Sequence, residues 1–146
     1  LAIEKGYQQV IWTDDTTHEN IEEAGAMNIF IRIGDTLITA PTSDRILDGI
    51  TRKSIIDIAR DQGIKVEVRN ISVHEIVSAA DNGTLQEMFG AGTAAVISPI
   101  DAFGFQEKDY ELPKQEASYA IQLKKRITDI QYNRSEDKFG WRYAVK

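Results

Sequence analysis

Asn28-Ile29-Phe30-Ile31-Arg32-Ile33-Gly34-Asp35-Thr36-Leu37-Ile38-Thr39-Ala40 is the stretch that decides the fold. Two runs of β-favouring residues, 28–33 and 36–40, flank the two-residue loop Gly34-Asp35. A two-residue loop that contains glycine, placed between two such runs, is a strong hairpin signal. We therefore expect an antiparallel hairpin over residues 28–40.

Short helical and strand-like segments surround this hairpin without regular alternation. Thr51–Gln62 has the apolar periodicity of a helix, and Gly63 ends it. Ser72 is suited to cap a second helix, Val73–Asp81, with Glu75 placed as in a capping box. The mixture favours an α+β fold over a doubly wound sheet. The other expected elements are strands at 8–13, 65–69 and 94–97, a turn at 90–93, an irregular stretch from Pro99, and a helix over Gln115–Ile130 with Ile121 and Lys124 on its apolar side.

Composition restricts the function classes before any motif is considered. The chain has 146 residues, and we expect 1–146 to form a single domain. A net charge of −6 leaves no basic excess to neutralise phosphates, which argues against a nucleic-acid partner. No apolar run approaches the ~20 residues that span a bilayer, and the absence of cysteine fits a cytoplasmic protein. His18 and His74 have no partners at metal-ligand spacing, so no metal site is expected.

Three segments carry residues suited to binding chemistry, and the first is Glu22-Glu23-Ala24-Gly25-Ala26-Met27-Asn28. A carboxylate at a strand entrance is solvated in most proteins. Adjacent residues of an extended chain point to opposite sides, so at most one of the two glutamates can face a given pocket.

The second segment is Leu47-Asp48-Gly49-Ile50-Thr51-Arg52-Lys53, at the start of the first helix. Free N–H groups and the helix dipole make a helix N-terminus a site for anions. Gly49 would let the backbone approach a ligand closely, and Thr51 adds a hydroxyl donor. The cations Arg52 and Lys53 suit this position better if an anion binds nearby. The simpler alternative is that Asp48 only caps the helix.

The third segment is Gly90-Ala91-Gly92-Thr93-Ala94, which precedes an expected buried strand. Closely spaced glycines allow a turn whose N–H groups converge on a phosphate or carboxylate. The plainer interpretation is a turn that only separates two elements. Two anion-binding turns and one carboxylate together indicate a phosphorylated ligand that contains nitrogen.

At these residues the chain resembles the branched-chain amino-acid aminotransferases, which are fold-type IV enzymes dependent on pyridoxal 5'-phosphate (PLP). The resemblance runs in order from Gly6 to Tyr132. It implies the large C-terminal domain of such an enzyme, with a mixed sheet or pseudo-barrel, flanking helices and a homodimeric assembly. The strings that carry it are Gly6-Tyr7-Gln8-Gln9-Val10-Ile11-Trp12, Glu23-Ala24-Gly25-Ala26-Met27-Asn28, Gly49-Ile50-Thr51-Arg52, Glu87-Met88-Phe89-Gly90-Ala91-Gly92-Thr93-Ala94 and Asp129-Ile130-Gln131-Tyr132.

The resemblance also implies roles for individual residues. Glu23 would pair with the protonated pyridine nitrogen of PLP and keep the ring an electron sink. The N–H groups at the start of the first helix would bind the cofactor phosphate. The reaction would move an amino group from leucine, isoleucine or valine to 2-oxoglutarate through pyridoxamine phosphate. The implied cofactor-binding residues are Glu23, Leu47, Ile50, Thr51 and Thr93, and the implied substrate-binding residues are Ala26, Thr93 and Ala94.

Three departures from the family pattern alter these expectations. The family's Schiff-base lysine lies upstream of the matching region, and no lysine here occupies its position, so we expect this chain alone to be inactive without an upstream domain. Ala26 stands where a threonine is common, which removes a hydroxyl contact. Ala95 and Ser98 replace the Cys-x-x-Cys pair of mammalian members.

Two other interpretations stay open. D-amino-acid aminotransferases and aminodeoxychorismate lyases share the fold, although the Gly90–Ala94 string and the Asp-Ile-Gln-Tyr ending of the last helix favour the branched-chain group. The chain could also be a non-catalytic module that binds PLP or phosphate.

Overall fold

The computed structural model describes residues 6–42, 49–92, 96–132 and 134–140. These residues form one mixed sheet of seven strands, a separate two-stranded hairpin and three helices. The sheet strands are β1 (Ile11–Thr13), β2 (Ile21–Ala24), β3 (Met27–Ile33), β4 (Thr36–Thr39), β5 (Lys65–Val68), β6 (Leu85–Gly92) and β7 (Val96–Pro99). The hairpin strands are β8 (Ala102–Phe105) and β9 (Lys108–Glu111), and the helices are α1 (Ile50–Asp61), α2 (Val73–Asp81) and α3 (Tyr119–Gln131).

Strand β3 pairs with three other strands of the sheet. Along one edge it pairs first with β2 and then with β4, and along the other edge it pairs with β6, all antiparallel. The sheet is mixed because β4 and β5 run parallel. Asn28 pairs with Glu23 on one side and with Ala91 on the other, so β2 and β6 lie on opposite edges of β3.

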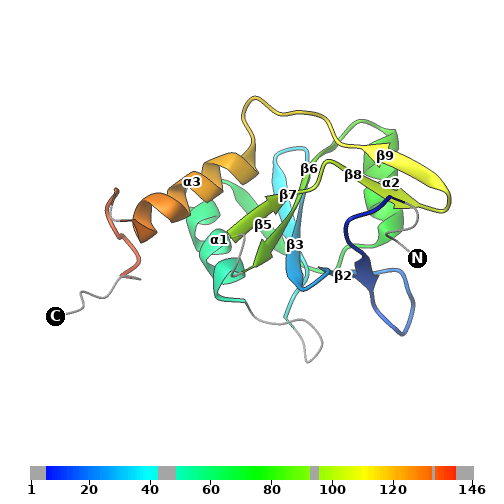
Figure 1. Ribbon diagram of the computed structural model, residues 1–146, viewed down its shortest axis with the longest axis horizontal. Coiled ribbons are helices and arrows are strands. Elements are labelled where there is room, and N and C mark those ends of the chain that lie inside the picture. Colours follow the sequence, from blue (N-terminus) through cyan, green and yellow to red (C-terminus); the bar gives the residue numbers. More distant parts are fainter. Residues whose placement is uncertain (1–5, 43–48, 93–95, 133, 141–146) are drawn as a thin grey trace.

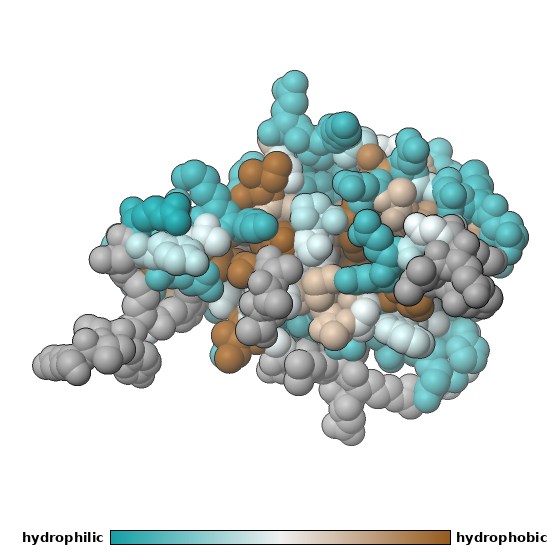
Figure 2. All heavy atoms as spheres, viewed as in Figure 1, coloured by the Kyte–Doolittle hydropathy of each residue, from teal (hydrophilic) through white to brown (hydrophobic). Residues whose placement is uncertain are grey.

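The two faces of the sheet bury separate apolar cores. Alternate residues of β3 divide between them: Phe30 faces α1 and α3, whereas Ile29 and Ile31 face α2 and the β8–β9 hairpin. Phe30 stacks on Phe89 of β6 with ring centroids 5.2 Å apart. Figure 1 shows the same division, with α1 and α3 on one side of the central strands and α2 on the other. Figure 2 shows polar side chains over much of this view, with apolar ones gathered near the middle.

Several sequence predictions are confirmed. The expected hairpin is β3–β4, with Phe30 opposite Thr39 and Ile33 opposite Thr36. The expected helices at 51–62 and 73–81 are α1 and α2. Ser72 caps α2 by accepting a hydrogen bond from the N–H of Glu75 at 3.1 Å. The expected α+β class is the observed class.

Other predictions were wrong. Gly90 and Gly92 lie inside β6 and do not form a turn, because Gly90 pairs with Ile29 of β3 and both glycines pair with β7. The stretch after Pro99 is not irregular: it contains the β8–β9 hairpin. The last helix begins at Tyr119, not at Gln115, because Ser118 caps it.

Two details of the expected elements also differ. Ile121 is 64% exposed and not on the buried side of α3, which is formed by Ala120, Leu123, Ile127 and Ile130. The strand expected at 8–13 covers only Ile11–Thr13, and β2 was not expected as a strand.

Candidate functional site

The first candidate segment lies in a row of paired residues that crosses the sheet. Trp12 of β1 pairs with Glu23 of β2, Glu23 pairs with Asn28 of β3, and Asn28 pairs with Ala91 of β6. Directly opposed residues of antiparallel strands point to the same face. Ala91 belongs to the core under α1 and α3, so Glu23 also points to that face.

The second segment meets this row at the N-terminus of α1. Gly49 is the N-cap residue, and a Cβ built on it would lie 2.6 Å from Oδ1 of Asn28. The backbone at the start of α1 therefore lies against the side chain of Asn28, which is the cross-strand partner of Glu23. Segments from residues 23, 28 and 49 converge at one end of β3.

Helix α1 differs from the other two described helices at its first turn. Serines cap α2 and α3, whereas Gly49 offers no side-chain cap. Ile50 is 87% exposed, and Thr51 is half-buried. The first N–H groups of a helix have no partner within the helix, so those of Ile50 and Thr51 can bind an anion. Arg52 is buried and donates a hydrogen bond from Nη2 to the carbonyl oxygen of Ala40 at 3.0 Å.

The close packing at Gly49 gives a testable expectation. Gly49→Ala should lower the free energy of unfolding by about 1–3 kcal/mol, because the new methyl group would overlap Asn28 unless the start of α1 moves. Urea unfolding measures the loss. The penalty should shrink when Asn28 is shortened to serine in the same chain. Equal penalties in both backgrounds would show that the contact does not limit this position.

The third segment adds the end of β6 to the same region. Gly90 and Gly92 leave room for Met27, since a Cβ on Gly90 would lie 2.8 Å from Cε of Met27. Ala91 points to the opposite face, beside Asn28. Val96, the first residue of β7, has φ of 57°, which is strained for a β-branched residue. Val96 directly follows residues 93–95, which lie outside the described residues and include the end of the expected Gly90–Ala94 turn.

Four of the seven predicted site residues lie among the described residues. Glu23, Ile50 and Thr51 come together at the end of β3 described above. Ala26 is exposed in the turn between β2 and β3. Leu47, Thr93 and Ala94 lie outside the described residues. The cofactor and substrate roles of all seven stay predictions.

A second polar cluster, which the sequence did not reveal, fixes the start of α3. The buried carboxylate of Glu87 accepts hydrogen bonds from Nη1 of Arg32 at 2.8 Å and from the hydroxyl of Ser118 at 2.6 Å. It also accepts from the N–H groups of Tyr119 at 2.8 Å and Ala120 at 3.2 Å. The guanidinium of Arg32 stacks 3.7 Å from the centre of the Tyr119 ring.

Burial raises the pKa of Glu87, but the hydrogen bonds from Ser118, Arg32 and the α3 N–H groups outweigh it and leave the pKa below its ordinary value. The carboxylate is therefore ionised at neutral pH and fully engaged. It joins β3, β6 and α3, and we interpret it as structural.

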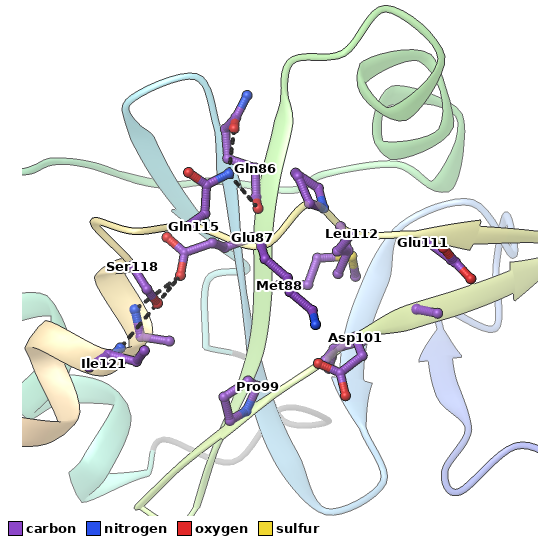
Figure 3. A pocket seen from close by; sticks show the side chains of 15 residues that line it. Gln86, Glu87, Met88, Pro99, Asp101, Glu111, Leu112, Gln115, Ser118 and Ile121 are labelled. Carbon is purple, nitrogen blue, oxygen red and sulfur yellow. Dashed lines mark hydrogen bonds between the residues drawn. The ribbon is translucent and has the colours of Figure 1, made fainter.

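A cavity of about 650 Å³ lies next to this cluster, between the N-terminal half of β6, the β8–β9 hairpin and the start of α3. Figure 3 shows its lining, with Gln86 and Gln115 joined by a hydrogen bond of 2.7 Å. None of the described site residues Glu23, Ile50 and Thr51 lines it. We place the candidate site at the end of β3 instead, because the N-cap residue of α1, Gly49, has no side chain to cap the helix.

The described residues contain neither a metal-binding cluster nor a helix suited to span a membrane. No group of three or more His, Cys, Asp or Glu side chains in these ranges is arranged to hold a metal ion. None of the described helices combines the length and hydropathy of a membrane span.

Known proteins resemble the chain in both sequence and fold. A probable branched-chain-amino-acid aminotransferase of Staphylococcus epidermidis is 43% identical over 141 residues, which cover 96% of this chain and 39% of that protein. Branched-chain-amino-acid aminotransferase 2 of Bacillus subtilis is 40% identical over 146 residues, covering 99% of this chain and 40% of that protein. The chain thus spans about 40% of the length of these relatives.

Two solved branched-chain aminotransferases resemble the chain in fold. The branched-chain aminotransferase of Escherichia coli has a TM-score of 0.78 at 27% identity, over 95% of this chain and 43% of that one. The Thermoproteus uzoniensis enzyme has a TM-score of 0.76 at 29% identity, over 96% of this chain and 43% of that one. The family model described as amino-transferase class IV matches residues 1–103. The chain belongs to the class IV aminotransferase family.

Proposed function

We propose that this chain forms the part of a branched-chain amino-acid aminotransferase that binds the phosphate and the pyridine nitrogen of PLP. The observation that carries the proposal is the convergence of Glu23, Asn28 and the N-terminus of α1 at one end of β3. Relatives named branched-chain aminotransferases support the substrate class. Another branched-chain amino acid aminotransferase of the same fold has been solved with pyridoxamine 5'-phosphate.

The groups present at the end of β3 fit this cofactor. N–H donors at the positive end of a helix dipole favour a phosphate, and Ile50 and Thr51 supply them after the N-cap residue Gly49, which has no capping side chain. A pyridinium nitrogen requires an anionic acceptor, and Glu23 points to the same face of the sheet. The N–H groups at the start of α1 therefore suit an anion, and the Glu23 carboxylate in β2 suits a cation.

PLP, when bound, supplies a pyridinium ring that withdraws electrons from the substrate α-carbon. Glu23 would hold the proton on the ring nitrogen. Ile50 and Thr51 would orient the cofactor by fixing its phosphate, and the positive charge of nearby Arg52 would favour that phosphate. We propose leucine, isoleucine or valine as amino donor and 2-oxoglutarate as acceptor.

Three further expectations belong to the same proposal. By the family resemblance, the Schiff-base lysine is not among these 146 residues, so the isolated chain should not transaminate. We propose that the full-length enzyme is a homodimer, which light scattering would test. We also propose that it works in the cytoplasm.

The test uses the full-length protein encoded by the natural gene. Its absorbance spectrum should show bound PLP, and L-leucine should convert that spectrum to the pyridoxamine form whereas D-alanine should not. Conversion by D-alanine alone would assign the chain to the D-amino-acid aminotransferases. A spectrum with bound PLP that no amino acid alters would contradict aminotransferase activity.

Thr51→Val should weaken PLP binding by about 10- to 100-fold in the full-length protein, because a hydrogen bond to a charged group is lost while the shape is kept. Equilibrium dialysis measures the dissociation constant. The matched control is Ser54→Ala on the same helix, since the Ser54 hydroxyl donates to the carbonyl oxygen of Ile50 at 2.9 Å. Equal binding by Thr51→Val and wild type would remove Thr51 from the phosphate site.

A further inference from the structure

Trp12 occupies an unusual position for a tryptophan. It is 56% exposed, lies on the short strand β1, and is not part of either apolar core of the described residues. Its cross-strand partner is Glu23. Directly opposed residues of an antiparallel pair have Cβ atoms about 4.5–5.5 Å apart, so the two side chains leave the sheet next to each other.

The packing of the neighbouring residues confirms which face the pair occupies. Ile11 and Ala24 are also cross-strand partners, and both pack into the core on the α2 side of the sheet. Side chains alternate along a strand, so Trp12 and Glu23 point to the opposite face. That face carries Asn28 and the N-terminus of α1.

We propose that Trp12 is a positioning residue of the cofactor site, which shields the Glu23 carboxylate from water and thereby strengthens its pairing with the ring nitrogen of PLP. The inference rests on the role proposed for Glu23. A charge pair weakens as its surroundings approach the dielectric of water. Glu23 is only half-buried, and Trp12 is the bulky side chain paired with it on β1, the last strand at this edge of the sheet.

A role in shielding differs from a role in stability. A half-exposed aromatic residue outside the cores contributes little to folding, so replacing Trp12 should leave the melting temperature nearly unchanged. It should instead act through the charge of Glu23. The effect should therefore disappear when that charge, or the ring nitrogen that it faces, is removed.

The experiment measures dissociation constants of PLP from full-length apo-protein in a double-mutant cycle of Trp12→Ala and Glu23→Gln. Trp12→Ala should weaken binding by about tenfold, the equivalent of one pKa unit at the ring nitrogen, and Trp12→Phe by no more than about threefold, since a smaller ring still excludes water. In the Glu23→Gln background Trp12→Ala should have no further effect.

Two controls distinguish the loss of shielding at Glu23 from a general disturbance of the cofactor site. A PLP analogue with carbon in place of the ring nitrogen should bind wild type and Trp12→Ala equally. Tyr132→Ala, which removes an exposed aromatic residue after α3, should bind PLP as wild type does. Equal losses from Trp12→Ala with and without the Glu23 carboxylate would overturn the inference and leave the proposed function standing. Failure of wild type to bind PLP would overturn the proposed function, and the inference with it.

Discussion

Replacing Glu23 by glutamine in the full-length protein should lower kcat/KM for leucine by roughly 100- to 1,000-fold, the range for loss of one preorganised electrostatic contact. The amide keeps the size of the side chain but cannot hold the proton on the cofactor ring nitrogen. The protein should still fold, because Glu23 is half-buried and contributes little to either core. A steady-state leucine assay together with a thermal melt measures both quantities.

Glu22 provides the matched control for this prediction. It precedes Glu23 in β2, but the pairing of β2 with β1 passes from Glu23 to Ile21 and skips Glu22, and Glu22 is also not paired with Asn28. Glu22→Gln should retain nearly full activity. Equal activity of the two variants would mean that the position of Glu23 opposite Asn28 does not determine catalysis.

Glu87→Ala should lower the free energy of unfolding by about 3–5 kcal/mol, the cost of leaving the other member of a buried ion pair without its partner. Arg32 and Glu87 are only 9% and 8% exposed, and Glu87 also holds the first N–H groups of α3. Urea unfolding measures the loss. The control is Lys125→Ala, which removes an exposed ion pair with Asp129 and should cost less than about 1 kcal/mol.

The same carboxylate predicts a dependence of stability on pH. The pKa of Glu87 is lower in the folded protein than in the unfolded chain, where a glutamate has a pKa of about 4.3. Its stabilising contribution is therefore complete above that value and is lost as pH falls through the lower, folded pKa. Stability of Glu87→Gln should fall less steeply with acidification. Parallel stability curves for Glu87→Gln and wild type would contradict the ionised, paired state of Glu87.

Local sequence signals predicted the elements whose structure depends on neighbouring residues. The β3–β4 hairpin follows from its Gly-containing loop, in which Gly34 has φ of 60°. The cap of α2 follows from Ser72 and Glu75, three residues apart. Each of these signals lies within a few residues of the structure that it specifies.

The β8–β9 hairpin escaped prediction because its turn lacks the expected residues. Gln106 and Glu107 both have positive φ, 51° and 64°, as a two-residue hairpin turn of type I′ requires. Asparagine, aspartate and glycine usually occupy such positions, so the sequence carried no turn signal. Phe103 packs on Tyr110 across the hairpin, with ring centroids 4.9 Å apart, and such aromatic cross-strand pairs stabilise strand pairing.

Contacts distant in sequence account for the other errors. Gly90 and Gly92 looked like a turn, yet they are strand residues whose missing side chains accommodate Met27. The start of α3 depends on Glu87, which lies 31 residues before Ser118. The candidate site was more predictable, because each of its segments carries its own signal. Their convergence required the pairing of Asn28 with both Glu23 and Ala91.

The most direct test of this account is a crystal structure of the full-length protein with PLP. We expect the phosphate within hydrogen-bond distance of the N–H groups of Ile50 and Thr51, and the ring nitrogen against the carboxylate of Glu23. Cofactor bound elsewhere, for instance in the cavity beside Gln86 and Gln115, would contradict the site proposed at the end of β3.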